Sequence, residues 1–189
     1  MPEVFFKPAE CLNDPSAPIA VPPSAPAALD AEVELAIIIG KDCKNVDERN
    51  AAEYILGYTV ANDVTARDVQ SRVSQWGFSK GYDGFCPLGP VVVRADAPGF
   101  DVANLSMRTV LNGETLQDGT SAQMIFSVGE IVAYLSRDTT LAAGTVIITG
   151  TPSGIGHSYN PPKYLTPGDD LKVSIGSGLG TLVNTIAVV

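Results

Sequence analysis

The chain has 189 residues, of which 45% are hydrophobic and 17% charged, and its formal net charge is −9 at pH 7. This composition excludes a disordered chain, and the acidic balance excludes a nucleic-acid binder that relies on a broad basic surface. The longest apolar run, residues 35–39, is far shorter than the roughly 20 residues of a membrane span, so we expect no membrane partner. Three widely spaced cysteines and no export signal favour a reducing, intracellular (cytoplasmic) location.

The N-terminal segment is rich in proline, since 7 of the 14 prolines lie within the first 26 residues. Proline cannot continue a helix and donates no ladder hydrogen bond. We therefore predict that residues 1–30 form an extended arm or edge-strand segment and that residues 31–189 form a single domain. Adjacent aromatic residues, Phe5 and Phe6, argue against a loose tail.

Strands dominate the rest of the prediction. Residues 32–40 alternate carboxylate and apolar residues and then become continuously apolar, which predicts a strand. An Asn-Gly pair at 112–113 predicts the tight turn of a hairpin over 106–117. We expect further strands over 57–63, 91–94, 145–149, 170–175 and 181–189. Many short strands predict a mainly β (α+β) fold, a mixed roll or sandwich.

Helices are expected to be few and short. A helix over 45–55 would begin at Asn45 as its cap. A second helix over 127–136 carries a capping box, Ser127 with Glu130 three residues later. Helical turns are expected over 66–73 and a loop over 74–89.

Three carboxylates are the first candidates for chemistry. Glu32 and Glu34 are two apart on the predicted strand, so their side chains share one face. A divalent cation would relieve their mutual repulsion, and oxygen ligands suit Mg²⁺, Mn²⁺ or Ca²⁺ rather than zinc. Asp63, at the end of the next strand, would complete a three-carboxylate site. The alternatives are a solvent-facing strand for the glutamates and a helix cap for Asp63.

Cationic and amide side chains follow the third carboxylate. Arg67 and Gln70 share one side of a helical turn and are placed to hold a substrate carboxylate. Lys80 lies in a Gly-rich stretch from which it can neutralise developing negative charge. A surface ion pair for Arg67 and a solvated Lys80 are the alternatives.

A Gly-rich loop, TGTPSGIG, follows an apolar strand at residues 149–156. The backbone N–H of Gly150 and the hydroxyl of Thr151 are available to an oxyanion or carboxylate. A nucleotide-binding P-loop is excluded, because no Gly-Lys-Ser/Thr follows and prolines stand where its helix would begin.

In this order, the motifs "FFKP", "EVELAIIIGK", "GYTVANDVTARDVQ", "QWGFSKGYDGFCPLGP", "LNGETLQDG", "TGTPSGIG", "LTPGD" and "GLGTLVN" resemble the fumarylacetoacetate hydrolase family over nearly the whole chain. The resemblance implies a mixed β-sandwich roll whose catalytic domain is residues 31–189, usually assembled as a homodimer. It also implies Mg²⁺ or Mn²⁺ held by Glu32, Glu34 and Asp63, with Ca²⁺ as a further candidate. The substrate pocket would be lined by Lys80, Arg67, Gln70, Gly150 and Thr151.

The family's substrates are small 2-oxo or 1,3-dioxo carboxylates, so the resemblance implies hydrolytic C–C bond cleavage of an acylpyruvate or fumarylacetoacetate-like compound through an enolate. The cation would act as a Lewis acid, and Lys80 would stabilise the enolate. Hydrolytic members activate water with a histidine ahead of the E-x-E strand, whereas the only histidine here is His157.

His157 is therefore the sole candidate histidine base, with mere surface exposure as its alternative. Oxaloacetate-type decarboxylation and keto–enol tautomerisation or isomerisation remain close alternatives, because they chiefly need an enolate sink. Two other hypotheses stay open: a catalytically idle metal-binding scaffold, and a chain that is a piece of a longer protein whose missing part supplies the base.

Overall fold

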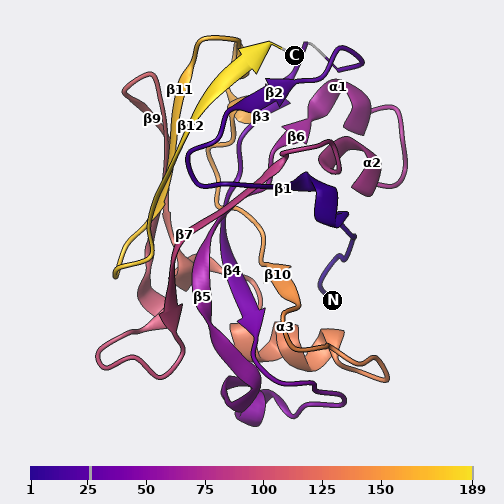
Figure 1. Ribbon diagram of the computed structural model, residues 1–189, viewed down its shortest axis with the longest axis vertical. Helices are drawn as coiled ribbons and strands as arrows, with labels where there is room; N and C mark the ends of the chain where they lie inside the picture. The colour runs from indigo at the N-terminus through magenta and orange to yellow at the C-terminus, as the bar shows by residue number, and fades with distance from the viewer. Residues whose placement is uncertain (26, 189) are drawn as a thin grey trace.

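The computed structural model describes residues 1–25 and 27–188, and two curled β-sheets packed face to face form its body (Figure 1). One sheet has the order β1-β7-β5-β4-β10 and the other β2-β12-β11-β8-β9. The first comprises β1 (Leu12–Asn13), β7 (Cys86–Arg94), β5 (Ile55–Asn62), β4 (Val33–Ile39) and β10 (Val146–Ile148). The second comprises β2 (Ile19–Val21), β12 (Gly180–Val188), β11 (Asp170–Ile175), β8 (Ser106–Leu111) and β9 (Glu114–Thr120). The expected mainly β roll is confirmed.

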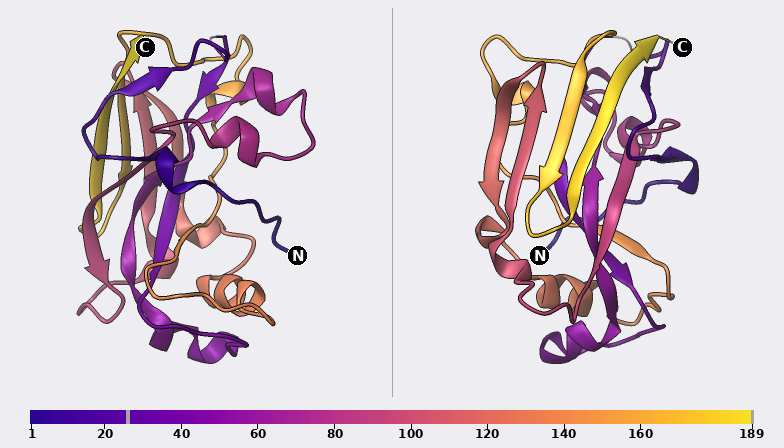
Figure 2. Two further views of the ribbon diagram at one scale, coloured as in Figure 1. Left: turned by 45° about the vertical axis from the view of Figure 1, so that its right-hand side comes forward. Right: turned by 60° about the vertical axis from the view of Figure 1, so that its left-hand side comes forward.

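The core lies between the two sheets (Figure 2). Leu35 and Ile37 on β4 are fully buried, as are Leu171 and Val173 on β11. Because side chains alternate across a strand, the apolar residues of β4 that enter this core send Glu34 to the opposite face. The alternation of carboxylate and apolar residues at the start of β4 therefore places the apolar side chains in the core and the carboxylate on the opposite face of the sheet.

Residues near the N-terminus add short edge strands to both sheets. Strand β1 pairs in parallel with β7, and β2 pairs in parallel with β12. A separate two-stranded pair joins β3 (Leu29–Asp30) to β6 (Thr65–Ala66). The first residues, which carry Phe5 and Lys7, cross toward β4 and β7 on the side of the molecule that also carries α1 and α2 (Figure 1).

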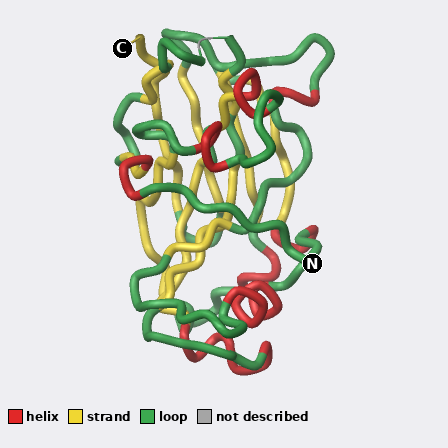
Figure 3. Tube along the Cα trace, turned by 90° about the vertical axis from the view of Figure 1, so that its right-hand side faces the viewer, coloured by secondary structure: helices red, strands yellow, loops and turns green. Residues whose placement is uncertain are grey.

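Short helices lie at one end of the sheets and along one side of them (Figure 1 and Figure 3). Helix α3 (Val128–Leu135) starts at the predicted capping box and packs against the 3₁₀ helix η2 (Glu48–Tyr54). Helices α1 (Arg67–Gln70) and α2 (Gly77–Lys80) lie together beside the two-stranded pair. The remaining 3₁₀ turns are η1 (Ala9–Cys11), η3 (Val102–Asn104), η4 (Ser121–Gln123) and η5 (Gly156–Ser158). None of the described helices is long and apolar enough to cross a membrane.

Two local predictions were wrong in part. Asp47, not Asn45, caps η2, because its side chain accepts the backbone N–H of Arg49, while Asn45 has a positive φ of 52° that an N-cap does not adopt. The stretch 74–89 is not all loop, since it contains α2 and the start of β7. The hairpin turn is confirmed: Asn112 and Gly113 both have positive φ, as the tight two-residue turn requires.

Candidate active site

Three carboxylates converge on one face of the first sheet. Glu34 lies on β4, Glu32 immediately precedes that strand, and Asp63 immediately follows β5. The antiparallel pairing of β4 with β5 places Asp63 beside Glu32, whose carbonyl accepts the backbone N–H of Asp63 at 2.9 Å. All three side chains are buried, and one carboxylate oxygen from each lies within 4.8 Å of the others. The convergence expected of these residues is therefore present.

This cluster has the electrostatics of a cation site. Burial raises the pKa of Glu34 well above its ordinary value, and the neighbouring Asp63 and Glu32 carboxylates raise it further. The backbone N–H of Gly150, which donates to Glu34 Oε2 at 2.6 Å, and the ammonium of Lys80 oppose that shift. An all-oxygen donor set suits a hard divalent cation such as Mg²⁺, Mn²⁺ or Ca²⁺. The residues present fit such an ion.

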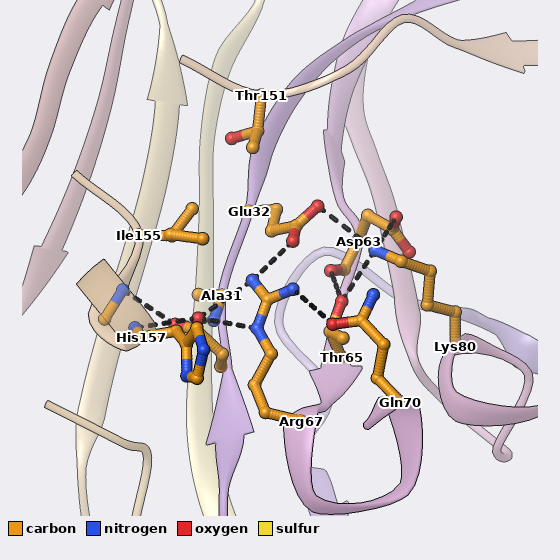
Figure 4. A network of polar contacts seen from close by, with 12 residues as sticks. Ala31, Glu32, Asp63, Thr65, Arg67, Gln70, Lys80, Thr151, Ile155 and His157 are labelled. Carbon is orange, nitrogen blue, oxygen red and sulfur yellow. Dashed lines mark hydrogen bonds and ion pairs between the residues drawn. The ribbon is translucent and has the colours of Figure 1, made fainter. Parts of the chain in front are cut away.

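Lys80 ends α2 and sends its ammonium into the carboxylate cluster (Figure 4). Its Nζ donates to Asp63 Oδ2 at 2.6 Å, Thr65 Oγ1 at 2.7 Å and Glu32 Oε2 at 3.1 Å. Burial lowers the pKa of Lys80, but the Asp63 and Glu32 carboxylates outweigh that effect and raise the pKa above its ordinary value. Lys80 is thus a buried, protonated cation whose charge is aimed at the site.

Arg67, at the start of α1, spans the site from the other side (Figure 4). Its guanidinium bonds Asp30 Oδ2 through Nε at 2.9 Å, Gln70 Oε1 through Nη1 at 3.0 Å, and Glu32 Oε1 through Nη2. Gln70 is therefore next to Arg67, as their spacing on a helical turn predicts. Asp30, which the sequence analysis missed, also accepts the backbone N–H groups of Gly156 and His157.

Thr151 lies across the site from Arg67 (Figure 4), and the backbone N–H of the preceding residue, Gly150, donates to Glu34. The Thr151 hydroxyl accepts from Gln117 Nε2 at 2.8 Å, while Gln117 Oε1 accepts from Val33 N and Thr109 Oγ1. Gln117 is thus a second missed residue: it ties the Gly-rich loop to β4 and β8. Gln117 lies within the motif "LNGETLQDG", but the motif does not reveal its partners, which come from three segments: the Gly-rich loop, β4 and β8.

His157 is not brought to the carboxylates. Its ring Nδ1 is 2.7 Å from the hydroxyl of Tyr164, and its backbone N–H binds Asp30. Figure 4 places it beyond Arg67 as seen from Glu32, and it is absent from the residues that line the cleft. The structure therefore gives no geometric support to His157 as a base.

The cluster lies in a cleft of about 1320 Å³. Besides the polar residues above, its lining is largely apolar and draws on the N-terminal segment, α2 and α3, including Phe5, Trp76, Met107, Phe126 and Tyr134. Phe5 packs edge-on against Trp76 with ring centroids 5.8 Å apart. This lining suits a small anionic ligand with an apolar or unsaturated portion.

Comparison with known proteins agrees with the motifs and the geometry. Residues 1–187 match the model of the fumarylacetoacetate (FAA) hydrolase C-terminal domain. Oxaloacetate tautomerase YisK of Bacillus subtilis is 43% identical over 84% of this chain and 52% of its own length. Caffeoylpyruvate hydrolase of Neonothopanus nambi is 40% identical over 98% of this chain and 59% of its own.

Among solved structures, the fumarylacetoacetate hydrolase of Exiguobacterium antarcticum superposes with a TM-score of 0.94 at 44% identity, covering 98% of this chain and 66% of that one. The chain thus spans about half to two thirds of the length of these relatives. With motif order, sheet topology and carboxylate cluster in agreement with the family match, the chain belongs to the fumarylacetoacetate hydrolase family.

Proposed function

We propose that this chain carries a divalent-metal-dependent site that enolises a small 2-oxo or 1,3-dioxo carboxylate, and that its reaction is keto–enol tautomerisation. One observation carries the proposal: the buried ammonium of Lys80 contacts Glu32 and Asp63 of a three-carboxylate cluster at the wall of a cleft. A fixed cation beside a metal-ligating cluster is suited to stabilising an enolate.

Each residue has a role in this proposal. Glu32, Glu34 and Asp63 would hold Mg²⁺ or Mn²⁺, which when bound supplies a Lewis acid for the oxo group. Arg67 offers a planar guanidinium to the substrate carboxylate, beside the Gln70 amide. Opposite them, the Thr151 hydroxyl, held by Gln117, limits the orientation of the substrate.

Lys80 would stabilise the negative charge of the enolate and donate the proton that the substrate carbon gains. In the enol-to-keto direction its ammonium gives one proton to C3 of the substrate while the enol hydroxyl loses its proton to solvent, and Lys80 then regains a proton from solvent. The direction of its pKa shift supports an ammonium at rest. Removing one such charge-stabilising donor lowers a rate by about 10²- to 10³-fold.

Tautomerisation is favoured over hydrolysis because it needs no activated water. The chain's single histidine, His157, is bonded to Tyr164 and lies outside the cleft lining, so a histidine base for water is lacking among the described residues. The relative named oxaloacetate tautomerase also supports this reading. Hydrolytic C–C cleavage is the second candidate, supported by the relative named caffeoylpyruvate hydrolase; decarboxylation would use the same enolate chemistry.

The proposal is tested with oxaloacetate by following loss of its ultraviolet enol absorbance in the presence of Mn²⁺. The wild-type chain and the control Lys172→Met, whose side chain is half exposed and pairs with Asp170, should accelerate the loss equally, and Lys80→Met should not. Product analysis then separates the reactions: pyruvate and CO₂ from oxaloacetate indicate decarboxylation, and pyruvate from an acylpyruvate indicates hydrolysis. Equal rates for the wild type and Lys80→Met would contradict the proposal.

Two further hypotheses remain predictions. A catalytically idle scaffold would bind Mn²⁺ yet turn over none of these compounds. The homodimer implied by the family would appear as twice the chain mass in analytical ultracentrifugation.

A further inference from the structure

A second lysine, Lys7, binds the same carboxylate as Lys80. Its Nζ donates to Asp63 Oδ1 at 2.7 Å, whereas Lys80 binds Oδ2 of that carboxylate. Lys7 belongs to the N-terminal segment, 56 residues away in the sequence, and its side chain is only 9% exposed. Burying a lysine ammonium costs free energy unless the charge is paired, and the Asp63 carboxylate pairs with the charge of Lys7.

All three N–H donors of the Lys7 ammonium are used. Besides Asp63, the ammonium donates to the main-chain carbonyl of Phe85 at 3.1 Å and to the main-chain carbonyl of Lys80. Phe85 is fully buried, and Lys80 is the last residue of α2. Lys7 therefore joins the end of β5, the end of α2 and the start of β7 at one point.

The two lysines differ in what holds them. Lys80 binds only side chains, those of Glu32, Asp63 and Thr65, and its ammonium lies among the carboxylate oxygens that a metal ion would use. Lys7 is anchored by two main-chain carbonyls, so its place is set by the fold. An ion entering the cluster would compete with Lys80 and leave the anchor of Lys7 intact.

We propose that Lys7 is a positioning residue of the metal centre: it fixes the Asp63 carboxylate in the orientation that coordinates the ion, and it thereby makes the N-terminal segment part of the site. The inference rests on the metal-binding part of the proposed function. It concerns the chain's own affinity for the ion and is independent of which oxo acid reacts.

The charge of Lys7 and its role as a positioning residue predict opposite changes in metal affinity when Lys7 is removed. As a nearby cation, Lys7 repels a metal ion, so its removal would tighten binding if charge alone mattered. As a positioning partner of a metal-ligating carboxylate, its loss weakens binding by about 10- to 100-fold. The direction of the change in metal affinity therefore separates the two roles.

The experiment is calorimetric titration of Mn²⁺ alone into the metal-stripped chain. We expect Lys7→Met to bind Mn²⁺ about 10- to 100-fold more weakly than the wild type, and Lys80→Met to bind it as tightly or more tightly. Lys172→Met, the exposed control, should bind it as the wild type does. Circular dichroism establishes that each variant is folded.

A second variant and a second readout guard against a folding defect. Lys7→Arg keeps the charge, but a planar guanidinium does not direct three donors to these three oxygens, so weakened binding is expected here too. Because coupling is reciprocal, Mn²⁺ should slow amide hydrogen exchange in residues 1–12 of the wild type but not of Lys7→Arg.

The outcomes are distinguishable. If Lys7→Met and Lys7→Arg bind Mn²⁺ as tightly as the wild type or more tightly, the inference is overturned and the metal centre stands. If Lys7→Met does not fold, Lys7→Arg alone tests the inference: Mn²⁺ affinity and Mn²⁺-dependent hydrogen exchange equal to those of the wild type would overturn it. Failure of the wild-type chain to bind Mn²⁺ overturns the metal centre and this inference together.

Discussion

Replacing Glu34 by Gln should have opposite effects on the metal-free and the metal-loaded chain. Glu34 is 3% exposed and its pKa is raised above the ordinary 4.5 by burial and by Asp63 and Glu32. A folded-state pKa above the unfolded value means that the folded chain keeps a proton which the unfolded chain has lost. The free energy of unfolding contributed by this group therefore falls as the pH rises above 4.5.

At pH 7 the neutral amide avoids that penalty and can still accept the Gly150 N–H. Metal-free Glu34→Gln should consequently be at least as stable as the metal-free wild type, and it should lack the part of the pH-dependent loss of stability that begins above 4.5. We therefore expect the buried Glu34 carboxylate to destabilise the ion-free chain, as is common where side chains are arranged for function.

The metal-loaded chain should show the reverse order. Mn²⁺ at 100 times its Kd stabilises the wild type by about 2.7 kcal/mol, which for a chain of this size raises the Tm by about 5–10 °C. Glu34→Gln, with one ligand weakened, should gain only a small part of this rise. Differential scanning calorimetry at pH 7, with and without Mn²⁺, measures both states.

A matched control is Glu53→Gln, at an exposed glutamate outside the cleft lining, which should behave as the wild type does. The reasoning is refuted if Mn²⁺ raises the Tm of Glu34→Gln as much as that of the wild type. It is also refuted if metal-free Glu34→Gln is clearly less stable than the metal-free wild type at pH 7.

Three further substitutions probe other parts of the site. Lys80→Met should lower the rate of enol-to-keto conversion by about 10²- to 10³-fold in the ultraviolet assay, and an unchanged rate would exclude Lys80 from catalysis. Thr151→Val removes the hydroxyl that Gln117 holds, so KM should rise by roughly 2- to 10-fold, as expected for one neutral hydrogen bond; an unchanged KM would contradict substrate contact. Asp30→Asn removes one of the two carboxylates that pair with Arg67 and leaves Glu32 in place, so the free energy of unfolding should fall by about 1–3 kcal/mol in urea titrations; no measurable loss would show that the Asp30 pair is not needed.

The sequence predicts the carboxylate cluster because strand geometry is local and regular. A period of two puts Glu32 and Glu34 on one face, and the antiparallel return of β5 along β4 brings Asp63 alongside. The capping box of α3 and the Asn-Gly turn are equally local signals, and both are confirmed. The helix cap was misplaced because Asn45 and Asp47 are both good caps, and only their backbone angles separate them.

The supporting residues were beyond sequence reasoning. Lys7, Asp30 and Gln117 each bind partners 30 or more residues away. Lys7 and Gln117 lie within the motifs "FFKP" and "LNGETLQDG", but neither motif reveals the partner of its polar residue. The roles of all three residues depend on which segments the sheets bring together. Similarly, the sequence predicts a loop at Lys80, whereas Lys80 is the last residue of the one-turn helix α2, which places its ammonium next to Asp63.

The central claim is that a divalent ion at these carboxylates enables the chain to exchange a proton at carbon 3 of a 2-oxo acid. Proton NMR of oxaloacetate in D₂O measures that exchange directly, with chain-free solutions at the same Mg²⁺ concentration as the background. The account predicts that the chain accelerates deuterium incorporation with Mg²⁺, that excess EDTA abolishes the acceleration, and that added Mg²⁺ restores it. Acceleration that persists unchanged in EDTA, or incorporation no faster than the chain-free background, would contradict the account.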